Sequence, residues 1–203
     1  MEIITRQKEG RKLDTFVLIL GIIVCVAGLY SFHLYYSSSL KLREKLEYIE
    51  ENDRELKRTL IKGLIYRFNN NEGNETPFDF ERFVANLFEK HYGGNAIVTE
   101  STGDGGIDIE HFQGEELYLG QVKCFDETNT VDYTPIAIIH SQMIKKGAKG
   151  GFIVTTSRFT ENARKYAEGL DIELYDGKDL VNLWIEDVQL EVEDSIDIIP
   201  SET

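Results

Sequence analysis

Two short segments in the second half of this 203-residue chain carry side chains suited to hydrolysing a phosphodiester bond. Residues 103–108 read GDGGID, and residues 121–123 read QVK. A hairpin turn at residues 113–116 would set the two strands side by side. Gln121 and Lys123 would share one face, because alternate residues of a strand point the same way. We therefore expect Asp108, Gln121 and Lys123 to converge on one point.

These three side-chain types define a specific chemistry. Carboxylate and amide oxygens suit Mg²⁺, a hard cation that prefers oxygen ligands, with Mn²⁺ as an alternative. Such a metal polarises a phosphoryl oxygen and lowers the pKa of its bound water. The lysine would orient the attacking water and offset charge in the transition state. Asp108 and Gln121 are thus expected to bind metal and Lys123 to be catalytic, whereas Asp104 is more typical of a glycine turn.

The elements around these segments alternate between helical and extended patterns. Thr76-Pro77 favours a helix start, because Thr is a good N-cap and Pro is tolerated at the first helical position. The pattern predicts helices at 77–92, 134–146, 159–169 and 178–184, and strands at 96–100, 107–112, 117–125, 151–155 and 172–175. This order, αβββαβαβα, indicates an α/β fold with a mixed sheet flanked by helices.

The GDGGID and Q-x-K segments resemble the Mrr-like branch of the PD-(D/E)xK nuclease superfamily, in which Gln replaces the second acid. Residues 80–83 (FERF) look like the first helix of that family, 151–157 (GFIVTTS) like its buried strand, and 172–180 like its closing strand and last helix. The resemblance covers residues 77–184. It implies a restriction-endonuclease-like fold, Mg²⁺-dependent DNA cleavage, and a contribution of Glu81 to the metal site. The best-known members restrict modified foreign DNA.

Two other functions remain open on the sequence alone. A repair or junction-type nuclease would share the fold and the metal chemistry, since neither fixes the substrate. A catalytically inactive DNA-binding or scaffold protein is disfavoured by the intact Asp108, Gln121 and Lys123. Candidate DNA contacts are four cations and two hydroxyls, which could equally belong to a solvated helix face and a strand end: Lys145, Lys146, Lys149, Arg158, Thr156 and Ser157.

The N-terminal third has a different composition. Residues 15–40 contain no Asp, Glu, Lys or Arg, and residues 16–36 have the length of a single membrane span. A signal peptide or a buried core helix fits this stretch less well. The expected organisation is a tail (1–15), a transmembrane helix (16–36), a helical stalk (37–68), a linker (69–75), the nuclease domain (76–184) and an acidic tail (185–203). The stalk could instead pack on the domain or lie along the membrane.

The charge distribution limits the partners. The net charge is −14, and residues 183–203 alone contribute −7, which argues against a non-specific DNA coat. Cys25 and Cys124 are too far apart in sequence to indicate a disulfide framework or a metal motif. Four cations lie just before the predicted span, at residues 6–12, and three just after it, at residues 41–45, which weakly favours a cytoplasmic N-terminus. A domain that cleaves DNA must instead lie in the cytoplasm, where DNA and Mg²⁺ are. We therefore expect a single-pass cell-membrane protein with a cytoplasmic C-terminus. A homodimer through the stalk or the nuclease domain stays open.

Overall fold

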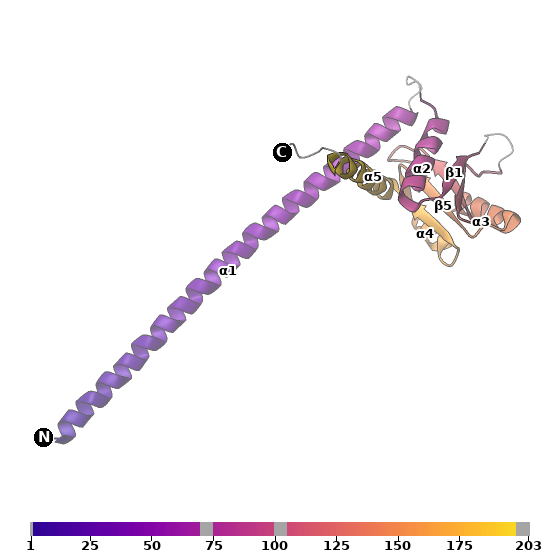
Figure 1. Cartoon of the computed structure of the whole chain (residues 1–203). Coiled ribbons are helices and arrows are strands. Elements are labelled where there is room, and N and C mark those ends of the chain that lie inside the picture. Colours follow the sequence, from indigo (N-terminus) through magenta and orange to yellow (C-terminus); the bar gives the residue numbers. More distant parts are fainter. Residues whose placement is uncertain (1, 70–74, 100–104, 198–203) are drawn as a thin grey trace. The chain divides into compact units, whose positions relative to one another are not determined.

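The computed structural model describes the backbone of residues 2–69, 75–99 and 105–197, and the side chains of these except 2–19, 22 and 191–197. The chain divides into two units, Met1–Arg54 and Glu55–Thr203. Helix α1 (Glu2–Asn69) begins in the first unit and ends in the second. All other helices and strands belong to the second unit (Figure 1).

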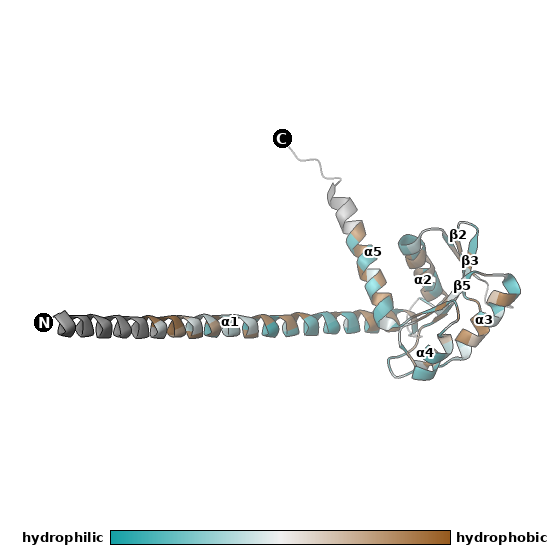
Figure 2. Cartoon of the chain, turned by 90° about the horizontal axis from the view of Figure 1, so that it is seen from below, coloured by the Kyte–Doolittle hydropathy of each residue, from teal (hydrophilic) through white to brown (hydrophobic). Residues whose placement is uncertain are grey.

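The first unit contains only α1, which runs through the predicted tail, span and stalk. Hydrophobic residues give way to mostly hydrophilic ones along this helix (Figure 2). Among the side chains that the structure describes, no helical stretch is long and apolar enough to cross a membrane. The predicted span includes residues 16–19 and 22, whose side chains lie outside the described set.

The second unit is built on a five-stranded sheet in the order β1-β2-β3-β5-β7. The first three strands form an antiparallel meander, and β3, β5 and β7 run parallel. A second, two-stranded sheet joins β4 to β6. The strands are β1 (Asn95–Val98), β2 (Ile109–Gln113), β3 (Glu116–Lys123), β4 (Thr130–Val131), β5 (Gly150–Thr155), β6 (Arg158–Phe159) and β7 (Ile172–Tyr175).

Helices cover both faces of the large sheet, as expected for an α/β fold. On one face, α2 (Pro77–Tyr92) and α5 (Gly177–Asp197) pack on Val122, Phe152 and Val154. On the other, α3 (Thr134–Lys146) and α4 (Glu161–Ala167) pack on Leu119 and Ile153. The expected mixed sheet flanked by helices is confirmed.

The end of α1 belongs to the core of the second unit. Ile61, Leu64 and Phe68 are buried on the α2 face, and the Phe68 ring lies 5.3 Å from the Phe80 ring and 5.8 Å from the Phe83 ring. These three apolar side chains recur at the spacing of one helix face. For the last turns of the predicted stalk, packing on the domain is therefore the correct alternative.

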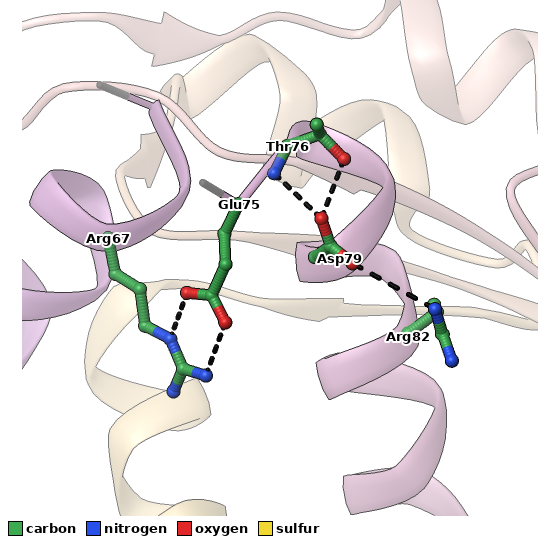
Figure 3. A network of polar contacts seen from close by, with 5 residues as sticks. All are labelled: Arg67, Glu75, Thr76, Asp79 and Arg82. Carbon is green, nitrogen blue, oxygen red and sulfur yellow. Dashed lines mark hydrogen bonds and ion pairs between the residues drawn. The ribbon is translucent and has the colours of Figure 1, made fainter. Parts of the chain in front are cut away.

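Polar contacts continue from α1 into the start of α2 (Figure 3). The Arg67 guanidinium donates to both carboxylate oxygens of Glu75, and this contact lowers the pKa of the Glu75 carboxyl. The Asp79 carboxylate accepts hydrogen bonds from the Thr76 backbone N–H and the Thr76 hydroxyl, both at 2.8 Å. This arrangement confirms the predicted helix start at Thr76-Pro77 and closes the first turn of α2.

Two predictions about the C-terminal half were wrong. The last helix is expected to end at residue 184, before the acidic tail, yet α5 continues to Asp197. No Gly or Pro interrupts residues 178–199, so nothing breaks the helix that starts at Gly177. The β4–β6 pair was also missed, because two-residue strands are too short to show a period.

Candidate active site

Asp108 is fixed at the entrance of β2 from both sides. Its backbone N–H donates to the Gly120 carbonyl at 2.8 Å, and its carbonyl accepts from the Thr99 N–H at 3.0 Å. Gly105 and Gly106 precede it with φ of 65° and 84°, in the left-handed region that side chains other than Gly rarely adopt. The two glycines thus allow the turn that places the Asp108 carboxylate beside β3.

The hairpin brings the three predicted residues together. Ile109 pairs with Gly120, so Asp108 lies opposite Gln121 in the same register. The Asp108 carboxylate accepts the Val122 N–H at 2.7 Å, and the same oxygen lies 3.7 Å from the Lys123 ammonium. The side chains of Asp108 and Lys123 are 12% and 33% exposed, so this pair is mostly buried but still within reach of solvent.

Gln121 is the most unusual member of the group. The residue is 6% exposed, and among the described residues its Oε1 has no hydrogen-bond partner. A buried polar atom without a partner costs about 1–3 kcal/mol, so native structures seldom retain one without a reason. An amide oxygen beside a carboxylate is a donor set that suits a hard divalent cation. The residues present therefore fit the metal that the resemblance implies.

The end of β3 is held by hydroxyl groups that were not predicted to have this role. The Thr155 hydroxyl donates to the Lys123 carbonyl at 2.8 Å. The Thr156 hydroxyl accepts the Phe125 N–H at 2.8 Å and donates to the Phe125 carbonyl at 2.7 Å. These contacts fix the backbone from which the lysine projects.

Burial raises the pKa of the neighbouring Cys124 thiol to about 11, which keeps it protonated and inert.

The hydroxyls predicted to contact DNA lie inside the fold. Thr156 and Ser157 are 2% and 3% exposed, and the Ser157 hydroxyl donates to the Asn129 carbonyl. Both side chains use their hydrogen-bonding capacity within the strand end. A DNA contact through these hydroxyls would require the segment to open.

The predicted basic surface is partly neutralised by acids that are distant in sequence. The Lys146 ammonium lies 2.5 Å from the Glu110 carboxylate, and the Lys149 ammonium lies 2.8 Å from the Glu116 carboxylate. Lys145 and Arg158 are exposed. The cations therefore do not form the uniform patch that the sequence suggested.

Glu81, the second predicted carboxylate ligand, is not placed in the group by the described contacts. Glu81 lies on α2, whose buried residues belong to the opposite face of the sheet, so its metal role stays a prediction. Asp104 lies outside the described residues. Within the described part of the chain, no three His, Cys, Asp or Glu side chains cluster as metal ligands. The predicted ligand set includes only two such side chains, Asp108 and Glu81.

Comparisons with known proteins identify the family of this chain. A family model described as a restriction endonuclease, the Mrr catalytic domain, matches residues 73–184. The Type IV methyl-directed restriction enzyme EcoKMrr of Escherichia coli (strain K12) is 33% identical over 120 residues. The match covers 55% of this chain and 38% of that enzyme.

Two solved structures are also similar. The DNA modification-dependent restriction endonuclease AspBHI matches with a TM-score of 0.49 and 24% identity, over 63% of this chain and 34% of its own. The MspJI restriction endonuclease in complex with a 27-mer oligonucleotide matches with a TM-score of 0.47 and 23% identity, over 64% and 30%. This chain spans about a third of the length of these relatives. Because the family model covers more than half of it, the chain belongs to the Mrr-type restriction endonuclease family.

Proposed function

We propose that the second unit is an endonuclease that hydrolyses phosphodiester bonds of DNA with the help of Mg²⁺, or of Mn²⁺. Family membership supports the reaction class. The observation that carries the proposal is the buried Gln121 Oε1, which has no partner among the described residues and lies on the strand opposite Asp108. A structural role alone gives no reason to bury this oxygen.

Each of the three residues has a distinct task in this proposal. Asp108 and Gln121 would hold the metal, which when bound polarises the phosphoryl oxygen and acidifies water. The Val122 N–H that donates to Asp108 fixes the orientation of the carboxylate. The Lys123 ammonium orients the attacking water and stabilises negative charge on the phosphate. Its 3.7 Å separation from Asp108 puts both groups within reach of one phosphate.

Incubation of the full chain with supercoiled plasmid DNA tests this function. We expect nicked and linear products with Mg²⁺ and none with EDTA. Cleavage that persists in EDTA would contradict metal-dependent chemistry. Failure to cut with either Mg²⁺ or Mn²⁺ on methylated and unmethylated plasmids would favour the alternative of an inactive DNA-binding or scaffold protein.

The substrate that we propose is modified foreign DNA. The E. coli relative, which this chain covers only in part, is named as methyl-directed. Comparing methylated with unmethylated plasmid tests this point. Preference for methylated DNA would support restriction, whereas preference for branched over linear DNA would favour a repair or junction nuclease of the same fold.

Restoring the second acid of the parent motif should strengthen metal binding. We expect Gln121→Glu to bind Mg²⁺ more tightly, because a carboxylate attracts a divalent cation more strongly than an amide does, and to retain some activity. Calorimetric titration with Mg²⁺ measures the affinity, and Gln189→Glu at an exposed position on α5 is the control. An unchanged affinity in Gln121→Glu would place this side chain away from the metal.

We also propose that residues 16–36 anchor the chain in the cell membrane, with the nuclease domain in the cytoplasm. The support is the uncharged stretch of residues 15–40 and the exposed apolar side chains of Leu29 and Phe32 on α1. The full chain should then fractionate with membranes, and a cytoplasm-dependent fluorophore fused after Thr203 should fluoresce. Recovery only in the soluble fraction would contradict the anchor, and activity of a periplasmic phosphatase fusion would contradict the orientation.

An exposed apolar seam on α1 supports a homodimer through this helix. Leu42, Ile49 and Leu56 are seven residues apart and are 59%, 61% and 53% exposed. This spacing suits a two-stranded coiled coil. Light scattering of the full chain should give twice the chain mass, and Ile49→Asp should lower it. A mass of one chain at every concentration would contradict the dimer.

A further inference from the structure

A cavity of about 570 Å³ opens at the end of the sheet away from the candidate active site. It is lined by the starts of the parallel strands and by the last turns of α2, including Tyr118, Gly150 and Ile172. Lys123 lies five residues further along β3 than Tyr118, about 16 Å at the rise of a strand. The cavity is therefore separate from the proposed nuclease site, and its volume is that of a small-molecule pocket.

Aromatic rings form its walls. Phe88 and Tyr92 come from α2, and Tyr118, Phe152 and Tyr175 come from three neighbouring strands. The Phe88 ring stacks on Phe152 at 4.4 Å and meets Tyr175 edge-on at 5.2 Å, so the base of the cavity is rigid. A Cβ at Gly150 would lie 3.1 Å from the Tyr118 ring, so the glycine lets this ring pack closely against the start of β5.

The tyrosine hydroxyls are already engaged. Tyr92 and Tyr175 share a hydrogen bond of 2.7 Å, and the Tyr175 hydroxyl donates to the Glu173 carboxylate. The Tyr118 hydroxyl donates to Glu116 at 3.0 Å. A ligand would thus meet ring faces and carboxylates rather than hydroxyl donors.

The charge of the lining is negative. Asp171 and Glu173 line the cavity together with one cation, Lys149, which is paired with the Glu116 carboxylate at 2.8 Å. The pKa of Tyr92 is raised first by burial and then by the nearby negative charge of Glu173. Phosphates and nucleotides would be repelled by this lining, whereas a cation would be attracted both by the carboxylates and by the ring faces.

We propose that this aromatic cavity binds an organic cation, either a guanidinium or an alkylated ammonium group. The partly exposed rings of Tyr92, Tyr118 and Tyr175 supply the faces over which such a cation is stabilised, the buried pair Phe88 and Phe152 supports them, and Glu173 supplies the opposite charge. The cation is either a free small molecule or the tip of a side chain on another protein. Binding there does not depend on the nuclease function.

Calorimetric titration of the full chain tests the proposal with agmatine, tetramethylammonium and the peptide acetyl-Gly-Arg-Gly-amide, each against sodium chloride of equal ionic strength. At least one cation should bind saturably. Tyr118→Leu, which removes a ring face, should weaken binding about tenfold, or about 1.4 kcal/mol. Glu173→Gln should weaken it severalfold. Agmatine and tetramethylammonium distinguish a free cation from the arginine of the peptide.

Two matched variants serve as controls. Tyr118→Phe keeps the ring and should keep binding, and Glu168→Gln removes an exposed carboxylate outside the cavity and should leave affinity unchanged. Thermal melting confirms that each variant is folded. The proposal is overturned if the folded parent binds none of the three probes, if both controls weaken binding as much as the test variants, or if uncharged cytidine displaces the bound cation.

Discussion

Replacing Lys123 by alanine is expected to abolish metal-dependent DNA cleavage while leaving the fold intact. The ammonium lies 3.7 Å from the Asp108 carboxylate, at the point where charge on the phosphate would develop. Loss of one such preorganised group costs about 10²–10³-fold in rate. The side chain is one-third exposed, and its backbone is held by Thr155 and by the pairing of β3 with β5, so truncation leaves little cavity. The rate at which supercoiled plasmid is nicked in Mg²⁺ measures the effect.

Two further variants separate catalysis from general electrostatics. Lys178→Ala removes an exposed lysine on α5, outside the candidate DNA contacts, and should cut within a few-fold of the parental rate. Asp108→Asn should lose both Mg²⁺ binding and cleavage, whereas Lys123→Ala should lose cleavage only. A Lys123→Ala protein that cuts at the parental rate would show that this lysine has no catalytic role.

The geometry around Asp108 could be predicted because it depends on local chain physics. The loop of Gly114 and Glu115 joins β2 to β3, and a two-residue loop fixes the register of a hairpin. Once the register is fixed, the period of two places Gln121 and Lys123 on one face. The sequence spacing alone therefore predicts that Asp108, Gln121 and Lys123 lie close together, as they do in the structure.

Contacts that cross the fold could not be predicted in the same way. Thr155 reaches Lys123 only because β5 pairs with β3 after a helical crossover, residues 124–149. Lys146 is opposed by Glu110, and Lys149 by Glu116, for the same reason. A charge count along the chain treats these lysines as a cluster, since it cannot include partners that tertiary packing supplies.

The end of α1 shows how the same limit affects a domain boundary. Its heptad-like pattern fits a free stalk as well as a packed helix, because both need one apolar face. The family model begins at residue 73 and so leaves this helix out. Only the burial of Leu64 and Phe68 at 2% exposure each shows that these turns complete the core beside α2. The folded unit consequently starts before the family's boundary.

Replacing buried side chains at the end of α1 by alanine should destabilise the second unit strongly. Phe68→Ala is expected to lower the free energy of unfolding by about 3–5 kcal/mol and Leu64→Ala by about 2–5 kcal/mol, because each leaves a cavity in a closed core. Tyr66→Ala, on the same helix but 71% exposed, is the control and should change it by about 0.5 kcal/mol or less. The midpoint of chemical unfolding of the second unit, followed by the fluorescence of Trp184, measures all three. If Phe68→Ala unfolds at the same midpoint as Tyr66→Ala, the end of α1 is a free stalk in solution and the nuclease domain is complete without it.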